Sequence, residues 1–190
     1  MSQSLSLAVR PHSALLAQLI GQHDPDPALC RQVHDEAVQA LVDMRRSMRP
    51  GTPAEMGAWL TRLCKFVANP PASETDFREA VAVIAEICAD LPQGVWVRET
   101  RVSWLQKGPD ASGRIPGKFW PYPAELYAHL SGYAAAMEAQ CQAIERVIQQ
   151  PALAAYATAR RNWAAGGHEG PAPKREDFIP EARDVRRVSR

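Results

Sequence analysis

The chain has 190 residues, of which 46% are hydrophobic, and its 22 Lys and Arg nearly balance its 21 Asp and Glu. A chain of this length hides roughly two-thirds of its unfolded surface on folding, so it can support one hydrophobic core. With a formal net charge of +1, the overall charge gives no reason to expect binding to nucleic acid or to a membrane. Any electrostatic argument therefore has to rest on local groups of charges.

The apolar residues occur in short stretches. No run approaches the ~18 apolar residues of a membrane span, and the first 22 residues have one Arg and no convincing cleavage site. We therefore expect a cytoplasmic protein that does not enter a membrane. Four widely spaced cysteines, none in a C-x-x-C pair, are expected to be free thiols buried in apolar helical segments: Cys30, Cys64, Cys88 and Cys141.

Proline and glycine divide the first half of the chain into helical segments. Asp26 can cap a helix that has Pro27 at its first position, the favoured place for proline. Thr52 and Glu55 form a capping-box pattern. Four helices are predicted in this half, over about 13–21, 27–48, 53–67 and 74–90.

The second half predicts three further helices, over about 94–106, 123–150 and 153–165, with Pro151 separating the last two. Residues 166–190 have few apolar side chains and many charges, which is typical of a disordered segment. The expected fold is all-α: a compact bundle of about five to six helices with a long C-terminal helix. Its expected parts are an N-terminal arm with a short helix (1–26), a helical domain (27–165) and a flexible charged tail (166–190).

Catalytic and metal-binding patterns are missing from the sequence. It has no phosphate-binding G-x-x-x-x-G-K-[ST] loop, no G-x-S-x-G elbow and no H-E-x-x-H helix. The nearest approach to a ligand cluster is His34 with Asp35 and Glu36, but adjacent helical residues point to different faces. We expect no catalytic residues, no metal and no cofactor, and therefore a protein that is not an enzyme.

The most distinctive segment is the aromatic and proline-rich turn over 118–123. In a structural interpretation, Phe119 and Trp120 pack under the third and fourth helices. In a functional interpretation, the turn presents a basic aromatic surface to a partner or to single-stranded DNA, whose bases stack on aromatic rings with ~1–3 kcal/mol each. The residues of that surface would be Arg114, Lys118, Trp120 and Tyr122.

The tail carries a second candidate site. Two large apolar residues stand among charges there, which is typical of a short motif that orders on a protein partner. The candidate partner-binding residues are Phe178, Ile179, Arg183, Arg186 and Arg187. The alternative is a tail that only keeps the protein in solution.

The stretch from Trp59 to Leu126 resembles small phage and prophage replication proteins of the helicase loader or inhibitor type. The resemblance rests on a Trp-bearing helix (58–60), a helix with an acidic start (76–80) and a proline-containing aromatic turn that enters a helix (119–126). It implies a helical domain followed by a flexible C-terminal segment that engages a hexameric replicative helicase. Tyr122 departs from the pattern, because a Ser or Thr cap is expected before the proline.

Two other non-enzymatic functions stay open at this point. One is a phage assembly or structural protein, such as a tail-assembly chaperone or scaffold, and the other is a host-directed inhibitor. The first would bind virion components or itself and be indifferent to DNA. The sequence does not determine the oligomeric state.

Overall fold

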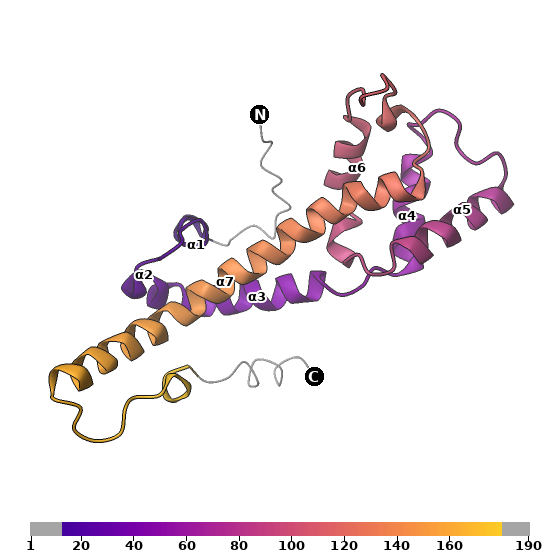
Figure 1. The fold of residues 1–190 in the computed structure, drawn as a ribbon. Helices are drawn as coiled ribbons and strands as arrows, with labels where there is room; N and C mark the ends of the chain where they lie inside the picture. The colour runs from indigo at the N-terminus through magenta and orange to yellow at the C-terminus, as the bar shows by residue number, and fades with distance from the viewer. Residues whose placement is uncertain (1–12, 180–190) are drawn as a thin grey trace. The chain divides into compact units, whose positions relative to one another are not determined.

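The structure, a computed structural model, describes residues 13–179 (Figure 1). These residues form α-helices and short 3-10 turns and contain no strand, so the all-α prediction and its long C-terminal helix are confirmed. The helices are α1 (Ala14–Ile20), α2 (Pro27–Gln32), α3 (His34–Ser47), α4 (Pro53–Leu63), α5 (Glu74–Ile87), α6 (Arg98–Leu105) and α7 (Pro123–Ala165). The 3-10 turns are η1 (Gln93–Val95), η2 (Pro116–Lys118) and η3 (Arg175–Asp177).

Contacts divide the chain into two units. Among the described residues, unit 1 comprises Asp43–Ala139, and unit 2 comprises 13–42 and 140–179. Both α3 and α7 therefore contribute residues to each unit. The division of the chain at residues 26 and 165 stays a prediction.

Unit 1 is built on the packing of α4 against α5 and α6 (Figure 1). The capping box of Thr52 and Glu55 starts α4 as predicted, and Ser73 with Asp76 forms a second one at the start of α5. Apolar residues spaced three and four apart then bury one face of each helix. The largest fully buried side chains of this unit are Trp59, Trp104, Met44, Met56, Leu60, Leu63, Ile84, Leu126 and Leu130.

Unit 2 has its own apolar cluster. Ser13 caps α1 by accepting a hydrogen bond from the amide of Leu16, and Asp26 caps α2 by accepting one from Ala28. The cluster joins α1, α2, the first part of α3 and the second part of α7, and its buried members are Leu16, Leu19, Cys30, Val33, Ala37, Ala40, Leu41, Ile144 and Val147.

The predicted helix 27–48 is interrupted at Val33. The backbone of Val33 (φ −103°, ψ 10°) is outside the helical range and ends α2, and α3 begins at the next residue. The predicted helix 94–106 is likewise shorter, because η1 and an extended Val97 precede α6. The hydroxyl of Thr100 in α6 donates a hydrogen bond to the carbonyl of Val95 at 2.6 Å, which helps to hold the non-helical backbone before α6.

The prediction that Pro151 separates two helices is wrong. Pro151 lies inside α7, which continues for 43 residues from Pro123 to Ala165. A proline in a helix interior costs about 3 kcal/mol relative to alanine, because it lacks the amide proton and its ring crowds the preceding turn. Strong helix formers on both sides, and the buried residues Ile144 and Val147 just before it, offset that cost.

The apolar side chains near the end of α5 differ in their exposure. Ile84 and Cys88 are fully buried, but Ile87 is 44% exposed, and Val83, one turn before it, is 47% exposed. Residues four apart share a helix face, so Val83 and Ile87 form a small apolar surface on α5. Each of the four cysteines is a free thiol as predicted, although Cys64 and Cys141 are only half-buried.

Candidate functional site

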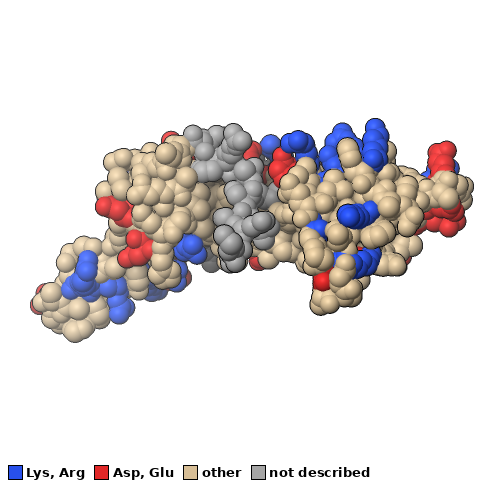
Figure 2. Space-filling view, turned by 90° about the horizontal axis from the view of Figure 1, so that it is seen from above, with Lys and Arg blue, Asp and Glu red and all other residues tan. Residues whose placement is uncertain are grey.

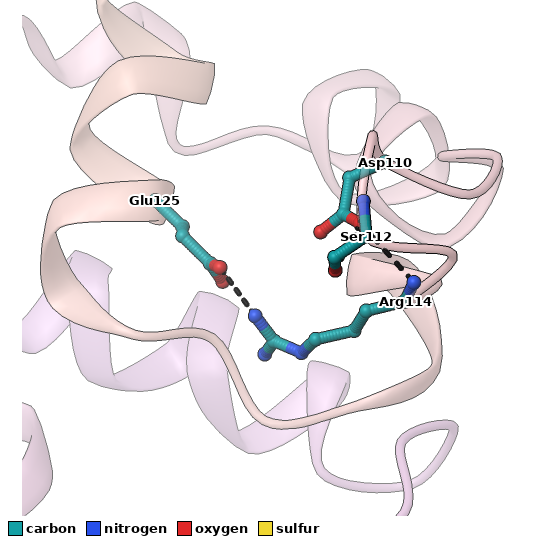
Figure 3. Close-up of polar contacts among 4 residues, drawn as sticks. All are labelled: Asp110, Ser112, Arg114 and Glu125. Atoms are coloured by element: carbon teal, nitrogen blue, oxygen red, sulfur yellow. Dashed lines mark hydrogen bonds and ion pairs between the residues drawn. The ribbon is translucent and has the colours of Figure 1, made fainter.

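The loop before the aromatic turn is held in shape by Asp110. Its Oδ1 accepts hydrogen bonds from the amide of Ser112 at 2.8 Å, the hydroxyl of Ser112 at 2.6 Å and the amide of Arg114 at 3.1 Å (Figure 3). The hydroxyl bond to Ser112 is the largest cause that lowers the pKa of Asp110. A carboxylate that closes a loop in this way fixes the backbone from which Arg114 extends.

Arg114 extends toward the start of α7, where its guanidinium forms an ion pair with Glu125 (Figure 3). The same guanidinium lies 4.8 Å from the ring centre of Tyr122 and 5.7 Å from that of Phe119. The structure therefore brings two of the predicted surface residues together, Arg114 and Tyr122. Tyr122 is 63% exposed, so one aromatic ring of the turn is available to a ligand.

The other two predicted residues of this surface, Trp120 and Lys118, differ in their exposure to solvent. Trp120 is half-buried, and its ring lies 6.0 Å from Phe77 of α5 in an edge-to-face arrangement. This contact is the packing on the fourth predicted helix that the structural interpretation expects. Lys118 is exposed, while its carbonyl accepts a hydrogen bond from the amide of Ala68 at 2.6 Å. The turn is thus part core and part surface.

The tail residues Phe178 and Ile179 are half-buried in unit 2. The ring of Phe178 lies 5.7 Å from that of Tyr156 on α7. The η3 turn precedes it, and the three residues of this turn are exposed. At the end of α7, the indole of Trp163 donates a hydrogen bond to the carbonyl of Gly170 at 3.1 Å. The other predicted tail residues, Arg183, Arg186 and Arg187, lie outside the described residues.

A polar cluster inside unit 1 joins α4, α6 and α7. Trp59 donates its indole hydrogen to the carbonyl of Val97 at 2.9 Å and is 3.2 Å from the hydroxyl of Thr100. His129 of α7 lies 3.0 Å from the carbonyl of Thr100 and edge-to-face with Trp104. A carbonyl only accepts, so Nε2 of His129 carries the proton. Burial is the main cause that lowers the pKa of His129.

Three arginines that the sequence analysis did not select lie beside this cluster. Arg98 and Arg101 are three residues apart on α6, and Arg62 lies on α4. Arg101 is only 9% exposed. Its pKa is lowered first by burial and then by the charges of Arg62 and Arg98, so both of these cations lie near Arg101. The signal in the sequence was the spacing of Arg98 and Arg101, which places both on one side of a helix.

No group of three or more His, Cys, Asp or Glu within residues 13–179 is placed to hold a metal ion. No helix in the described part of the chain is long and apolar enough to cross a membrane. Burial raises the pKa of Cys88 to about 11, which keeps this thiol protonated and unreactive at neutral pH.

Comparison with known proteins identifies no relative. No protein-family model matches the chain, no curated protein matches it, and no solved structure matches its fold.

Proposed function

We propose that this chain is a non-enzymatic adaptor of phage or prophage DNA replication that binds a replicative helicase and loads or inhibits it. The observation that supports this proposal most directly is the pair Phe178 and Ile179. These two large apolar side chains are half-buried and follow three exposed charged residues. Apolar side chains that stand among charges suit a segment that docks into a partner's groove.

The contact with Tyr156 supports a switch between two sites for this segment. An aromatic pair is worth about 0.5–1.5 kcal/mol beyond the area it buries. A partner surface that covers Phe178 more fully than Tyr156 does would offset the loss of this contact. The segment then exchanges an internal contact for an intermolecular one at small cost.

The aromatic turn supports a second contact, with single-stranded DNA. Tyr122 offers an exposed ring, and Arg114 lies over it while paired with Glu125. A base stacked on Tyr122 would be accepted irrespective of its identity, because every base has a π face. We assign this turn to DNA and the tail to the helicase.

The test is binding of a purified replicative helicase to the full chain and to the double variant Phe178→Ala/Ile179→Ala. We expect the double variant to bind at least tenfold more weakly, because hot-spot aromatic residues carry most of the energy of such contacts. Arg175→Ala/Glu176→Ala is the matched control, since it changes two exposed neighbours without altering net charge.

Equal binding by the wild type and the Phe178→Ala/Ile179→Ala variant would contradict the assignment of the helicase contact to the tail. Failure of the wild-type chain to bind any replicative helicase of its host would contradict the adaptor function itself. Helical content measured by circular dichroism checks that each variant is folded.

A further inference from the structure

Three arginines lie on the two helices that pack together in unit 1, Arg62 on α4 and Arg98 and Arg101 on α6. The hydrogen bond from Trp59 to the carbonyl of Val97 fixes this meeting point. Arg62 follows Trp59 by three residues on α4, so the two share a face. The bond therefore places Arg62 beside the start of α6, which carries the other two arginines.

Arg101 is nine-tenths buried and lacks an acidic partner. Within residues 13–179, no hydrogen bond or ion pair involves its guanidinium, and none involves the exposed Arg62 or Arg98. Glu99 is the acid that acts on Arg101, and its effect on the pKa is smaller than those of burial and the two arginines. The nitrogens of this guanidinium are not among the fully buried polar atoms, so the stem of Arg101 is covered while its charged head reaches solvent, where an anion can bind it.

The start of α6 adds further positive potential. The residue before the helix is Val97, which has no side chain that can accept a hydrogen bond from the first amides. The first amides of α6 therefore have no side-chain cap, and the acidic residue of its first turn, Glu99, opposes only part of the positive end of the helix dipole. Figure 2 shows several Lys and Arg side chains on the face of unit 1 that it presents.

We propose that Arg62, Arg98 and Arg101 form a binding site for a phosphate group. The planar guanidinium suits phosphate because its donors match two phosphate oxygens at once. Arg101 forms the base of the site, and Arg62 and Arg98 form its exposed rim. The phosphate can come from the backbone of a nucleic acid strand or from a free anion. This site shares no residue with the tail or the aromatic turn, so it does not depend on the helicase assignment.

The experiment uses the full chain and measures binding of a fluorescent oligothymidine of about 20 nucleotides, long enough to cover a single-strand site. Anisotropy is recorded between about 50 and 200 mM salt, where phosphate contacts show most clearly. The rim variant Arg62→Gln/Arg98→Gln is expected to bind about tenfold more weakly, and its slope of log K against log salt is expected to fall by about 1.4. Arg46→Gln/Arg78→Gln is the control, because it removes the same charge from two exposed residues of unit 1.

The base of the site is tested with Arg101→Met, which keeps an apolar stem of similar length. Since the guanidinium has no acidic partner, this variant should unfold at the same or a higher temperature while strand binding weakens at least tenfold. A lower unfolding temperature together with unchanged binding would show a structural arginine and overturn the proposal.

Titration with inorganic phosphate distinguishes the two sources. Strand binding that depends on the arginines and far exceeds phosphate binding assigns the site to nucleic acid. Phosphate binding that depends on the arginines, without strand binding, assigns it to a small anion. The proposal is overturned if the wild type binds neither ligand at about 50 mM salt, or if the control variant weakens binding as much as the rim variant does.

Discussion

The indole of Trp59 donates a hydrogen bond to the carbonyl of Val97 at 2.9 Å, and this bond links α4 to the residue that precedes α6. Trp59 is 1% exposed and also packs edge-to-face on Trp96, with ring centres 5.8 Å apart. One side chain thus contributes to the core of unit 1 and sets the position of the proposed phosphate site.

The variant Trp59→Phe tests this linkage. It keeps an aromatic ring but removes the indole donor and leaves a small cavity, so we expect a loss of about 2–3 kcal/mol in the free energy of unfolding. Strand binding should weaken as well, because Arg62 is no longer held against α6. Trp163→Phe is the control: its donor bonds Gly170 at an exposed site, and we expect a change within about 0.5 kcal/mol. Urea denaturation measures both, and equal losses would contradict the account.

The ion pair of Arg114 and Glu125 is expected to stabilise the aromatic turn modestly. The two side chains are 28% and 32% exposed, so solvent screening limits the coupling to about 0.5–1 kcal/mol. A double-mutant cycle with Arg114→Gln and Glu125→Gln measures it. One oxygen of Glu125 is buried without a hydrogen-bond partner among the described residues, so Arg114→Gln alone should cost more than the double variant. Additive single effects would exclude the coupling.

Gly117 lies where the backbone of η2 approaches the end of α6. A Cβ atom at this position would stand 2.4 Å from the carbonyl oxygen of Trp104, and a backbone atom cannot move aside cheaply. We expect Gly117→Ala to cost about 1–3 kcal/mol. Gly108→Ala meets no atom within 4 Å and should be nearly neutral. Thermal unfolding compares the two, and similar unfolding temperatures would contradict the close approach.

The buried side chain of His129 is expected to make the stability of the fold depend on pH. Burial lowers its pKa below the ordinary value of 6.5, so the unfolded chain binds a proton more readily than the folded one. Its contribution to stability is fully present above pH 6.5 and is lost as the pH falls through the folded pKa. His129→Gln should therefore show a smaller drop in unfolding temperature between pH 7.5 and 5.5 than the wild type. The other histidines are common to both proteins and cancel, so an identical drop would contradict this assignment.

Local signals in the sequence were sufficient for most of the fold. The capping residues Asp26 and Thr52 and the apolar spacing of α4 and α5 depend on neighbours within a few positions, and the structure has these helices where they were predicted. The break at Val33 lies in the core of unit 2, whose members come from distant parts of the chain, and local propensity does not contain such packing. The continuation of α7 through Pro151 depends partly on the same core, through Ile144 and Val147, and partly on the strong helix formers around the proline.

The candidate sites were less accessible to sequence reasoning. The aromatic turn was recognised, but the sequence did not show that Trp120 packs on Phe77 while Tyr122 stays exposed. The arginine group could not be predicted from the sequence, because Arg62 and Arg98 are 36 positions apart and are brought near each other only by the packing of α4 on α6. Charges that a fold brings together from different helices leave no local pattern.

The adaptor function is tested most directly by affinity capture from the lysate of the native bacterial host, with the full chain and with the chain ending at Ala165 as baits. None of residues 166–179 belongs to a buried core, so the shorter bait should keep its helical fold. The account predicts that mass spectrometry recovers a replicative helicase with the full chain and not with the shorter one. Equal recovery of virion or host-defence proteins by both baits, without a helicase, would contradict it.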